Sequence, residues 1–179
     1  MSRALADRST RLYDRQQISE ALDRIAENLN RRCAGQEWLV LCVMNGGLMV
    51  TSELLQRFSF DVRLDHLKVS RYHEQTSGRE LVWYSHPAES LRGRHILLID
   101  DIFDEGATLA AIHDYCLEAG AATVLSAVLV QKDHDRVLTT YRPDEVGLIC
   151  PDVYIFGFGM DAAGLSRNLP EIRQLRQTD

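Results

Sequence analysis

The sequence predicts an α/β fold, with a mainly parallel twisted sheet flanked by helices. Residues 38–44, 95–99 and 124–130 form continuous apolar runs, with the length and aliphatic composition of strands that are buried on both faces. Segments in which apolar residues recur at helical spacing separate these runs. Strands that alternate with crossover helices are typical of a parallel sheet.

The first part of the chain predicts a helix with a recognisable start. Asp14 and Gln17 have the spacing of a capping box, and the helix is expected to end near Gly35. Its apolar stripe consists of Ile18, Leu22, Ile25 and Leu29. The next elements are a strand at 38–44, a glycine loop at 45–47 and a helix at 48–58.

The rest of the chain continues the alternation. A polar segment at 72–80 separates two expected strands and has the composition of a mobile loop. A further helix carries an apolar stripe that Gly120 terminates, formed by Leu109, Ile112, Cys116 and Ala119. The remaining strands are expected at 60–72, 81–85, 95–99, 124–130, 146–149 and 154–158.

Length and composition favour one domain over residues 1–179 and exclude several classes of protein. The net charge of −6 argues against a nucleic-acid-binding surface. The sequence contains no apolar run near the roughly 20 residues that span a bilayer, and its start lacks a signal-peptide core, so we expect a cytoplasmic protein. The four cysteines form no C-x-x-C pair and the six histidines show no metal-binding spacing, so we expect no zinc site.

Residues 95–108, HILLIDDIFDEGAT, are the most informative stretch. An aliphatic strand ends in Asp100 and Asp101, Asp104 follows, and a glycine turn leads into a helix at Thr108. Ligands of open parallel sheets bind outside the carboxyl ends of the strands, and a helix start after a glycine loop is an anion cradle. Acids beside such a cradle suit a ligand that also carries hydroxyls or a divalent cation. A sugar phosphate with magnesium fits this description.

Other residues at strand ends allow two interpretations. The loop of Asn45, Gly46 and Gly47 could simply turn the chain, or its amides could face the same crevice as the acids. Lys132 follows an apolar strand and is either a solvated lysine or a ligand contact. Tyr154 could belong to the core. The sequence has no Walker A pattern, so ILLIDD is not read as a Walker B strand.

The order of these motifs resembles the hypoxanthine–guanine branch of the purine phosphoribosyltransferases, over about residues 38–170. The order runs from the glycine loop through a polar lid, the double-acid phosphate loop and a strand-end lysine to P-D-V-Y-I-F-G-F-G-M-D and S-R-N-L-P. The resemblance implies a type I phosphoribosyltransferase fold. Its core would span about 38–150, and a small hood would be formed by about 1–35 and 151–179.

The resemblance also implies roles for individual residues. Asp104 would be the catalytic base for the purine N7 proton. The phosphoribosyl group and its 5′-phosphate would be bound by Asp100, Asp101, Asp104, Glu105, Gly106, Ala107 and Thr108. The purine would be bound by Lys132, Tyr154, Ile155 and Asp161. Pyrophosphate would be bound by Asn45, Gly46, Gly47 and Arg167. Magnesium would be held by Asp100, Asp101 and Asp161, and the lid would begin at Arg71 and Tyr72.

The predicted function is therefore a purine salvage enzyme, which transfers the phosphoribosyl group from phosphoribosyl pyrophosphate to hypoxanthine or guanine. The resemblance implies a homodimer or homotetramer. The main alternative is a regulatory protein of the same fold that binds phosphoribosyl pyrophosphate or nucleotide without turnover, and a receiver-type signalling domain is more remote. The sequence does not rank hypoxanthine, guanine and xanthine. Asn45, Asp100, Glu105, Ala107 and Arg71 depart from commoner members of the family.

Overall fold

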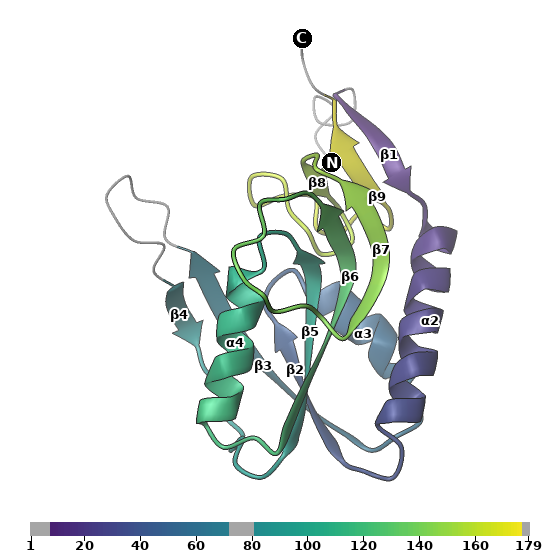
Figure 1. The fold of residues 1–179 in the computed structure, drawn as a ribbon. Helices are drawn as coiled ribbons and strands as arrows, with labels where there is room; N and C mark the ends of the chain where they lie inside the picture. Colours follow the sequence, from purple (N-terminus) through teal and green to yellow (C-terminus); the bar gives the residue numbers. More distant parts are fainter. Residues whose placement is uncertain (1–7, 72–80, 177–179) are drawn as a thin grey trace.

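The computed structural model describes residues 8–71 and 81–176. Its centre is a six-stranded sheet in the order β4-β3-β2-β5-β6-β7 (Figure 1). Neighbouring strands are parallel from β3 to β7, and β4 is the antiparallel edge strand. The strands are β2 (Trp38–Val43), β3 (Val62–Arg71), β4 (Leu81–Ser85), β5 (His95–Phe103), β6 (Thr123–Asp133) and β7 (Glu145–Pro151). The predicted α/β fold with a mainly parallel sheet is confirmed.

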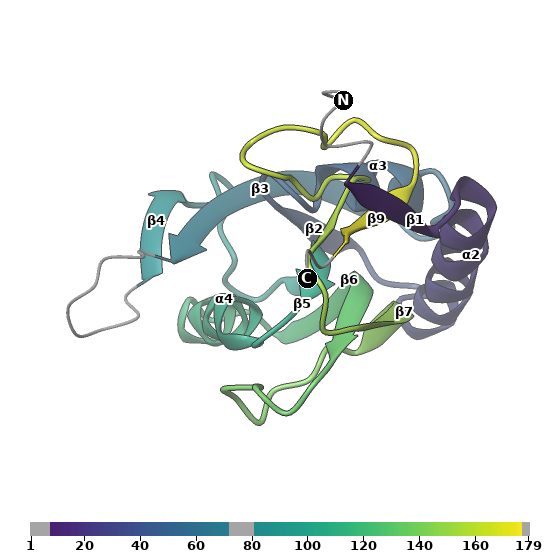
Figure 2. The same cartoon turned by 90° about the horizontal axis from the view of Figure 1, so that it is seen from above.

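Helices cover both faces of this sheet. Helices α2 (Arg15–Arg32) and α3 (Leu48–Leu55) pack on one face, and α4 (Ala107–Glu118) packs on the other (Figure 2). The alternation along β2 explains the arrangement, because Val40 points to the α2 side and Leu39 and Leu41 point to the α4 side. All six residues of β2 are buried, as the continuous apolar run predicted.

The expected capping box at the start of α2 is present. The Gln17 backbone N–H donates to the Asp14 side chain at 2.9 Å, and the Asp14 backbone N–H donates to the Gln17 side chain at 3.0 Å. Helix α3 ends at Leu55, three residues before the predicted end at Phe58. Within the described ranges, the structure has no helix long and apolar enough to cross a membrane.

A second, three-stranded antiparallel sheet joins the two ends of the chain. It contains β1 (Ser9–Tyr13), β9 (Ile172–Leu175) and β8 (Ile155–Phe156) in that order. The strand predicted at 154–158 is shorter because Gly157, Phe158 and Gly159 all have positive φ. This sheet lies at the end where the parallel strands terminate (Figure 1). Helix α2 belongs to the segment predicted as part of the hood, but it packs against the large sheet. The division into a core and a hood is therefore a proposal.

Candidate active site

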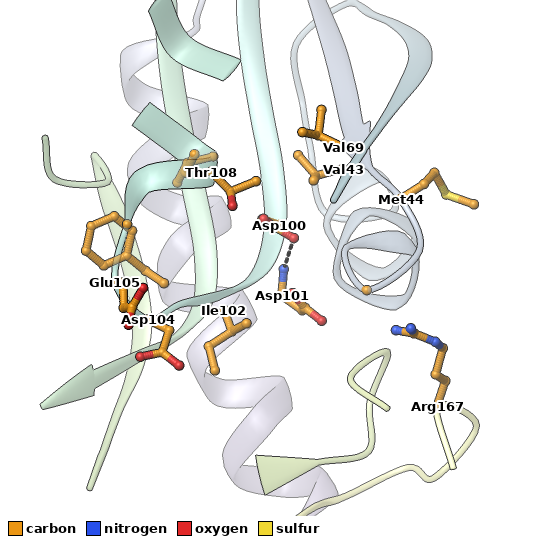
Figure 3. Close-up of a pocket in the computed structure, with 14 residues that line it drawn as sticks. Val43, Met44, Val69, Asp100, Asp101, Ile102, Asp104, Glu105, Thr108 and Arg167 are labelled. Carbon is orange, nitrogen blue, oxygen red and sulfur yellow. Dashed lines mark hydrogen bonds between the residues drawn. The ribbon is translucent and has the colours of Figure 1, made fainter. Parts of the chain in front are cut away.

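Strand β5 carries the first acids of the site to the carboxyl edge of the sheet. It continues to Phe103, four residues beyond its predicted end, so Asp100 and Asp101 lie within it. The Asp101 backbone N–H donates to the Asp100 carboxylate at 2.9 Å (Figure 3). The chain then turns at Gly106, where φ is +81° and an added Cβ would lie 2.4 Å from the Phe103 ring. Glycine is required there for both conformation and space.

A cavity of about 420 Å³ lies over this turn. It brings together the segment from Asp100 to Leu109, which we call the acid loop, with Gly46 and with Arg167 from the C-terminal part of the chain. Figure 3 shows Arg167 reaching the site from the C-terminal segment. Its lining comprises Val43, Met44, Gly46, Val69, Asp100, Asp101, Ile102, Phe103, Asp104, Glu105, Gly106, Thr108, Leu109 and Arg167.

The glycine loop packs tightly against β5, which explains both glycines. A Cβ on Gly46 would lie 1.9 Å from the Asp101 Oδ2, and a Cβ on Gly47 would lie 2.6 Å from the Ile99 carbonyl oxygen. The Gly47 N–H donates to the Val43 carbonyl at 3.0 Å, so it is already engaged. Asn45 is exposed, outside the cavity lining. Of the four residues expected to contact pyrophosphate, Gly46 and Arg167 line the cavity, and Asn45 and Gly47 do not.

A second cavity of about 230 Å³ adjoins the first and shares Asp101, Ile102 and Asp104 with it. All four residues predicted to bind a purine line this second cavity. Its lining comprises Asp101, Ile102, Asp104, Lys132, Tyr154, Ile155, Met160 and Asp161. The Tyr154 side chain is half exposed beside this cavity, and its hydroxyl donates to the Asp161 carbonyl at 3.1 Å.

Asp100 and Asp101 are adjacent acids on β5, and little positive charge offsets the repulsion between their carboxylates. Burial and the adjacent Asp101 carboxylate raise the pKa of Asp100 well above its ordinary value. Burial also raises the pKa of Asp101, although hydrogen bonding with Asp100 and the charge of Arg167 lower it in part. Oxygen ligands from two such carboxylates suit a hard divalent cation, which would remove their repulsion. Asp100 and Asp101 therefore fit the metal site that the sequence predicts.

Asp161, the third predicted metal ligand, is held by other groups. Its Oδ1 accepts a hydrogen bond from Arg167 at 2.7 Å, and its Oδ2 accepts one from the Gly164 backbone N–H at 2.7 Å. Arg167 also donates to the Gly159 carbonyl at 2.7 Å. A metal that used Asp161 would compete with Arg167 for the same carboxylate.

Asp104 lies in a different electrostatic environment from the β5 acids. Lys132 Nζ is 3.0 Å from its Oδ2, and His134 Nε2 is 2.6 Å from its Oδ1. Burial raises the pKa of Asp104, but the hydrogen bonds from His134 and Lys132 outweigh burial and hold it below its ordinary value. Asp104 is therefore an ionised carboxylate in the free protein.

Asp104, His134 and Asp152 form a second cluster whose atoms could hold a metal, with ligand atoms within 4.8 Å of one another. Two positively charged side chains already contact these acids. Lys132 Nζ lies 3.8 Å from Asp152, and Arg136 lies 2.6 Å from the same carboxylate. These side chains compensate the acids, so the cluster is an ion-pair network and a poor cation site.

The negatively charged side chain of Glu105 also has a positively charged partner. Arg136 lies 3.7 Å from the Glu105 carboxylate and 3.9 Å from that of Asp104. Arg136 is exposed, so these are weak, screened contacts. They nevertheless place a positive charge beside Glu105, one of the positions that depart from commoner members of the family.

Comparisons with known proteins decide the family. The phosphoribosyl transferase domain family matches residues 8–163. The chain belongs to this family. A hypoxanthine-guanine phosphoribosyltransferase of Lactococcus lactis is 30% identical over 166 residues, which cover 92% of this chain and 90% of that protein. The corresponding enzyme of Streptococcus pneumoniae is 28% identical over 167 residues, covering 93% and 92%. The predicted hypoxanthine–guanine branch is confirmed.

Solved structures agree with the fold. A hypoxanthine phosphoribosyltransferase of Staphylococcus aureus superposes with a TM-score of 0.90 at 24% identity, covering 98% of this chain and 96% of that one. A hypoxanthine-guanine phosphoribosyltransferase of Bacillus anthracis has a TM-score of 0.84 at 25% identity, covering 93% and 96%.

Some residues predicted to belong to the site of this phosphoribosyltransferase do not line either cavity, and some residues at the site were not predicted. Arg71 ends β3, and Tyr72 with the predicted lid at 72–80 lies outside the described residues. Ala107 begins α4 beside the first cavity. The sequence analysis did not identify His134 or Met160. His134 had one signal, its position two residues after Lys132, but β6 ends between them at Asp133.

Proposed function

We infer that this protein is a purine salvage enzyme, which transfers the 5-phosphoribosyl group from phosphoribosyl pyrophosphate to hypoxanthine or guanine. The products are IMP or GMP and pyrophosphate. The observation that carries this function is the pair of adjoining cavities with a shared wall of Asp101, Ile102 and Asp104. The first cavity is lined by the β5 acids and the start of α4, and the second is lined by Lys132 and Tyr154, so two substrates could meet at the shared acids.

The division of the cavities supports the predicted roles. The 5′-phosphate would bind at the start of α4, where the first-turn N–H groups of Gly106 to Thr108 and the helix dipole favour an anion. Pyrophosphate would lie between Gly46 and Arg167. The ribose hydroxyls would face Asp100 and Asp101.

In the second cavity, the purine would stack on Tyr154 and meet the backbone of Ile155. Lys132 would donate to the purine 6-oxo group, and Asp104 would accept the N7 proton as the new bond to the sugar forms. Because the sugar carbon develops positive charge, catalysis would depend mainly on positioning and on charge stabilisation.

Magnesium is the proposed metal. Asp100 and Asp101 would hold it, with Asp161 available only if it exchanges its Arg167 partner. The ion would neutralise charge on the leaving pyrophosphate. The preference of Mg²⁺ for oxygen ligands agrees with this donor set.

A turnover assay tests the function directly. Purified protein is mixed with phosphoribosyl pyrophosphate, Mg²⁺ and hypoxanthine, guanine, xanthine or adenine in turn, and nucleotide formation is followed. We expect IMP and GMP, and little AMP. Binding of phosphoribosyl pyrophosphate without any nucleotide product would instead favour the regulatory alternative. The homodimer or homotetramer and the cytoplasmic location remain predictions.

A further inference from the structure

His134 is the one histidine that contacts the reaction centre within the described residues. Its side chain is only 6% exposed, and its Nε2 lies 2.6 Å from the Asp104 Oδ1. We propose that His134 is a positioning residue, which holds one oxygen of the base Asp104 and leaves the other oxygen to meet the purine. The inference rests on the proposed function.

The hydrogen bonds of the ring fix its tautomer. The Arg136 backbone N–H donates to His134 Nδ1 at 3.0 Å. A backbone N–H can only donate, so Nδ1 carries no proton, and the ring proton must be on Nε2. His134 is therefore a neutral ring that donates to Asp104. If Nδ1 were protonated, its N–H would point at the Arg136 backbone N–H, and two donors would face each other.

This tautomer excludes a proton relay through His134. Nε2 already carries its hydrogen and cannot accept the N7 proton from Asp104, and Nδ1 is blocked by the Arg136 backbone. The proton must stay on Asp104. What His134 contributes is the orientation of the carboxylate.

That orientation matters because Lys132 has two tasks. In this structure it lies 3.0 Å from Oδ2 of Asp104, the oxygen that His134 does not hold. To donate to the purine 6-oxo group, Lys132 must leave this oxygen, and Oδ2 then becomes available for N7. Without His134, the Asp104 carboxylate could rotate and keep its ion pair with Lys132. Neither Asp104 nor Lys132 would then be positioned to contact the purine.

The charged neighbours of Asp104 do not replace His134. Arg136 is 3.9 Å from the same Oδ1, too long for a hydrogen bond, and is exposed. Glu105 and Asp152 are acids, and Asp101 and Asp161 line the cavity as carboxylates too. Lys132 is the other close donor.

The experiment compares two variants of His134 with a matched histidine control. His134→Leu removes the donor at similar volume, and His134→Gln retains an N–H donor. His66→Leu replaces a largely exposed histidine on β3, away from both cavities of the site. Steady-state kcat and KM are measured for hypoxanthine and for phosphoribosyl pyrophosphate. A hydrogen bond to a charged group predicts a loss in kcat of roughly 10- to 100-fold for His134→Leu.

The expected pattern separates positioning from a structural role. His134→Leu should lose kcat while KM for phosphoribosyl pyrophosphate is unchanged, His134→Gln should recover most of the loss, and His66→Leu should resemble wild type. Full activity of His134→Leu, or equal losses in the Leu and Gln variants, overturns the inference. Wild-type protein without any transferase activity would instead refute the proposed function.

A measurement on the wild type covers the case in which His134→Leu does not fold. Nitrogen-15 NMR of the histidine side chains should show His134 with its proton on Nε2, and Asp104→Asn should shift that Nε2 signal. A proton on Nδ1, or no response to Asp104→Asn, overturns the inference without any assay of activity.

Discussion

Replacing Lys132 with Met should weaken the selection of 6-oxopurines over adenine. Lys132 is one of only two lysines in the chain, and its side chain is 12% exposed at the edge of the second cavity. An ammonium only donates, so it pairs with a 6-oxo acceptor but confronts the 6-amino group of adenine with a second donor. A site that depends on one such pairing rejects the wrong partner strongly.

The structure limits the size of this effect. A hydrogen bond to a charged group is worth about 1.5–3 kcal/mol, which corresponds to roughly 10- to 150-fold in kcat/KM. Lys132 already has a partner in the free protein, since its Nζ lies 3.0 Å from Asp104. Binding the purine exchanges one charged partner for a neutral one, so we expect the lower end, roughly tenfold for hypoxanthine and guanine.

The pH profile gives a second readout of Lys132→Met. Hydrogen bonds from His134 and Lys132 hold the pKa of Asp104 below its ordinary value despite burial. Removing Lys132 takes away one of these, so the pKa of Asp104 should rise. The acid limb of kcat/KM, which reports the free enzyme, should therefore move to higher pH. Lys68→Met on β3 is the matched control, since Lys68 lies over the Tyr84 ring and outside both cavities of the site.

The assay is initial velocity with hypoxanthine, guanine and adenine at saturating phosphoribosyl pyrophosphate, from pH 5 to 9. Lys132→Met should lose activity with the two oxopurines, narrow the gap to adenine and keep KM for phosphoribosyl pyrophosphate. Unchanged base selectivity in Lys132→Met would show that another group reads the 6-position and would refute this reasoning.

Further predictions concern the acids, the glycine loop and the aromatic wall. Asp104→Asn should reduce kcat by roughly 10²- to 10⁴-fold, with phosphoribosyl pyrophosphate binding retained in calorimetry, because the amide cannot accept the N7 proton. Gly46→Ala should abolish that binding, since its Cβ would lie 1.9 Å from the Asp101 Oδ2; near-normal affinity would contradict the packing. Asp100→Asn should raise the melting temperature in metal-free buffer by relieving carboxylate repulsion, and should reduce any stabilisation by Mg²⁺. Tyr154→Ala should raise KM for purines and leave the melting temperature nearly unchanged, because its ring is half exposed.

The large sheet could be predicted because its strands are buried on both faces. Leu39 and Leu41 contact the α4 side while Val40 contacts the α2 side, so no polar residue interrupts the run. The small sheet could not be predicted in the same way. Ser9 pairs with Leu175, and β1 and β9 are short strands with mixed burial, so no local period marks them. Their pairing depends on tertiary structure that brings the chain ends together.

The site shows the same division between local and distant signals. The acid loop and helix start form one continuous segment, so their proximity follows from the sequence. That Arg167 approaches the cavity depends on a glycine turn, where a Cβ on Gly159 would lie 2.1 Å from the Gly46 carbonyl oxygen. A contact across more than 100 residues has no local pattern, and the resemblance to the family was needed to predict Arg167.

The opposite pKa shifts within one short segment follow from the neighbouring strand. Asp100 and Asp101 face a cavity with little positive charge and have raised pKa values, whereas Asp104 meets side chains from the end of β6 and has a lowered one. Lys132 lies near the end of β6 and His134 just beyond it, and both side chains contact the Asp104 carboxylate. Carboxyl groups whose environments push their pKa values apart have different tasks. The β5 pair needs a cation or a sugar hydroxyl to be satisfied, and this argues for a ligand there, while Asp104 is ionised before any substrate binds and can act as the base.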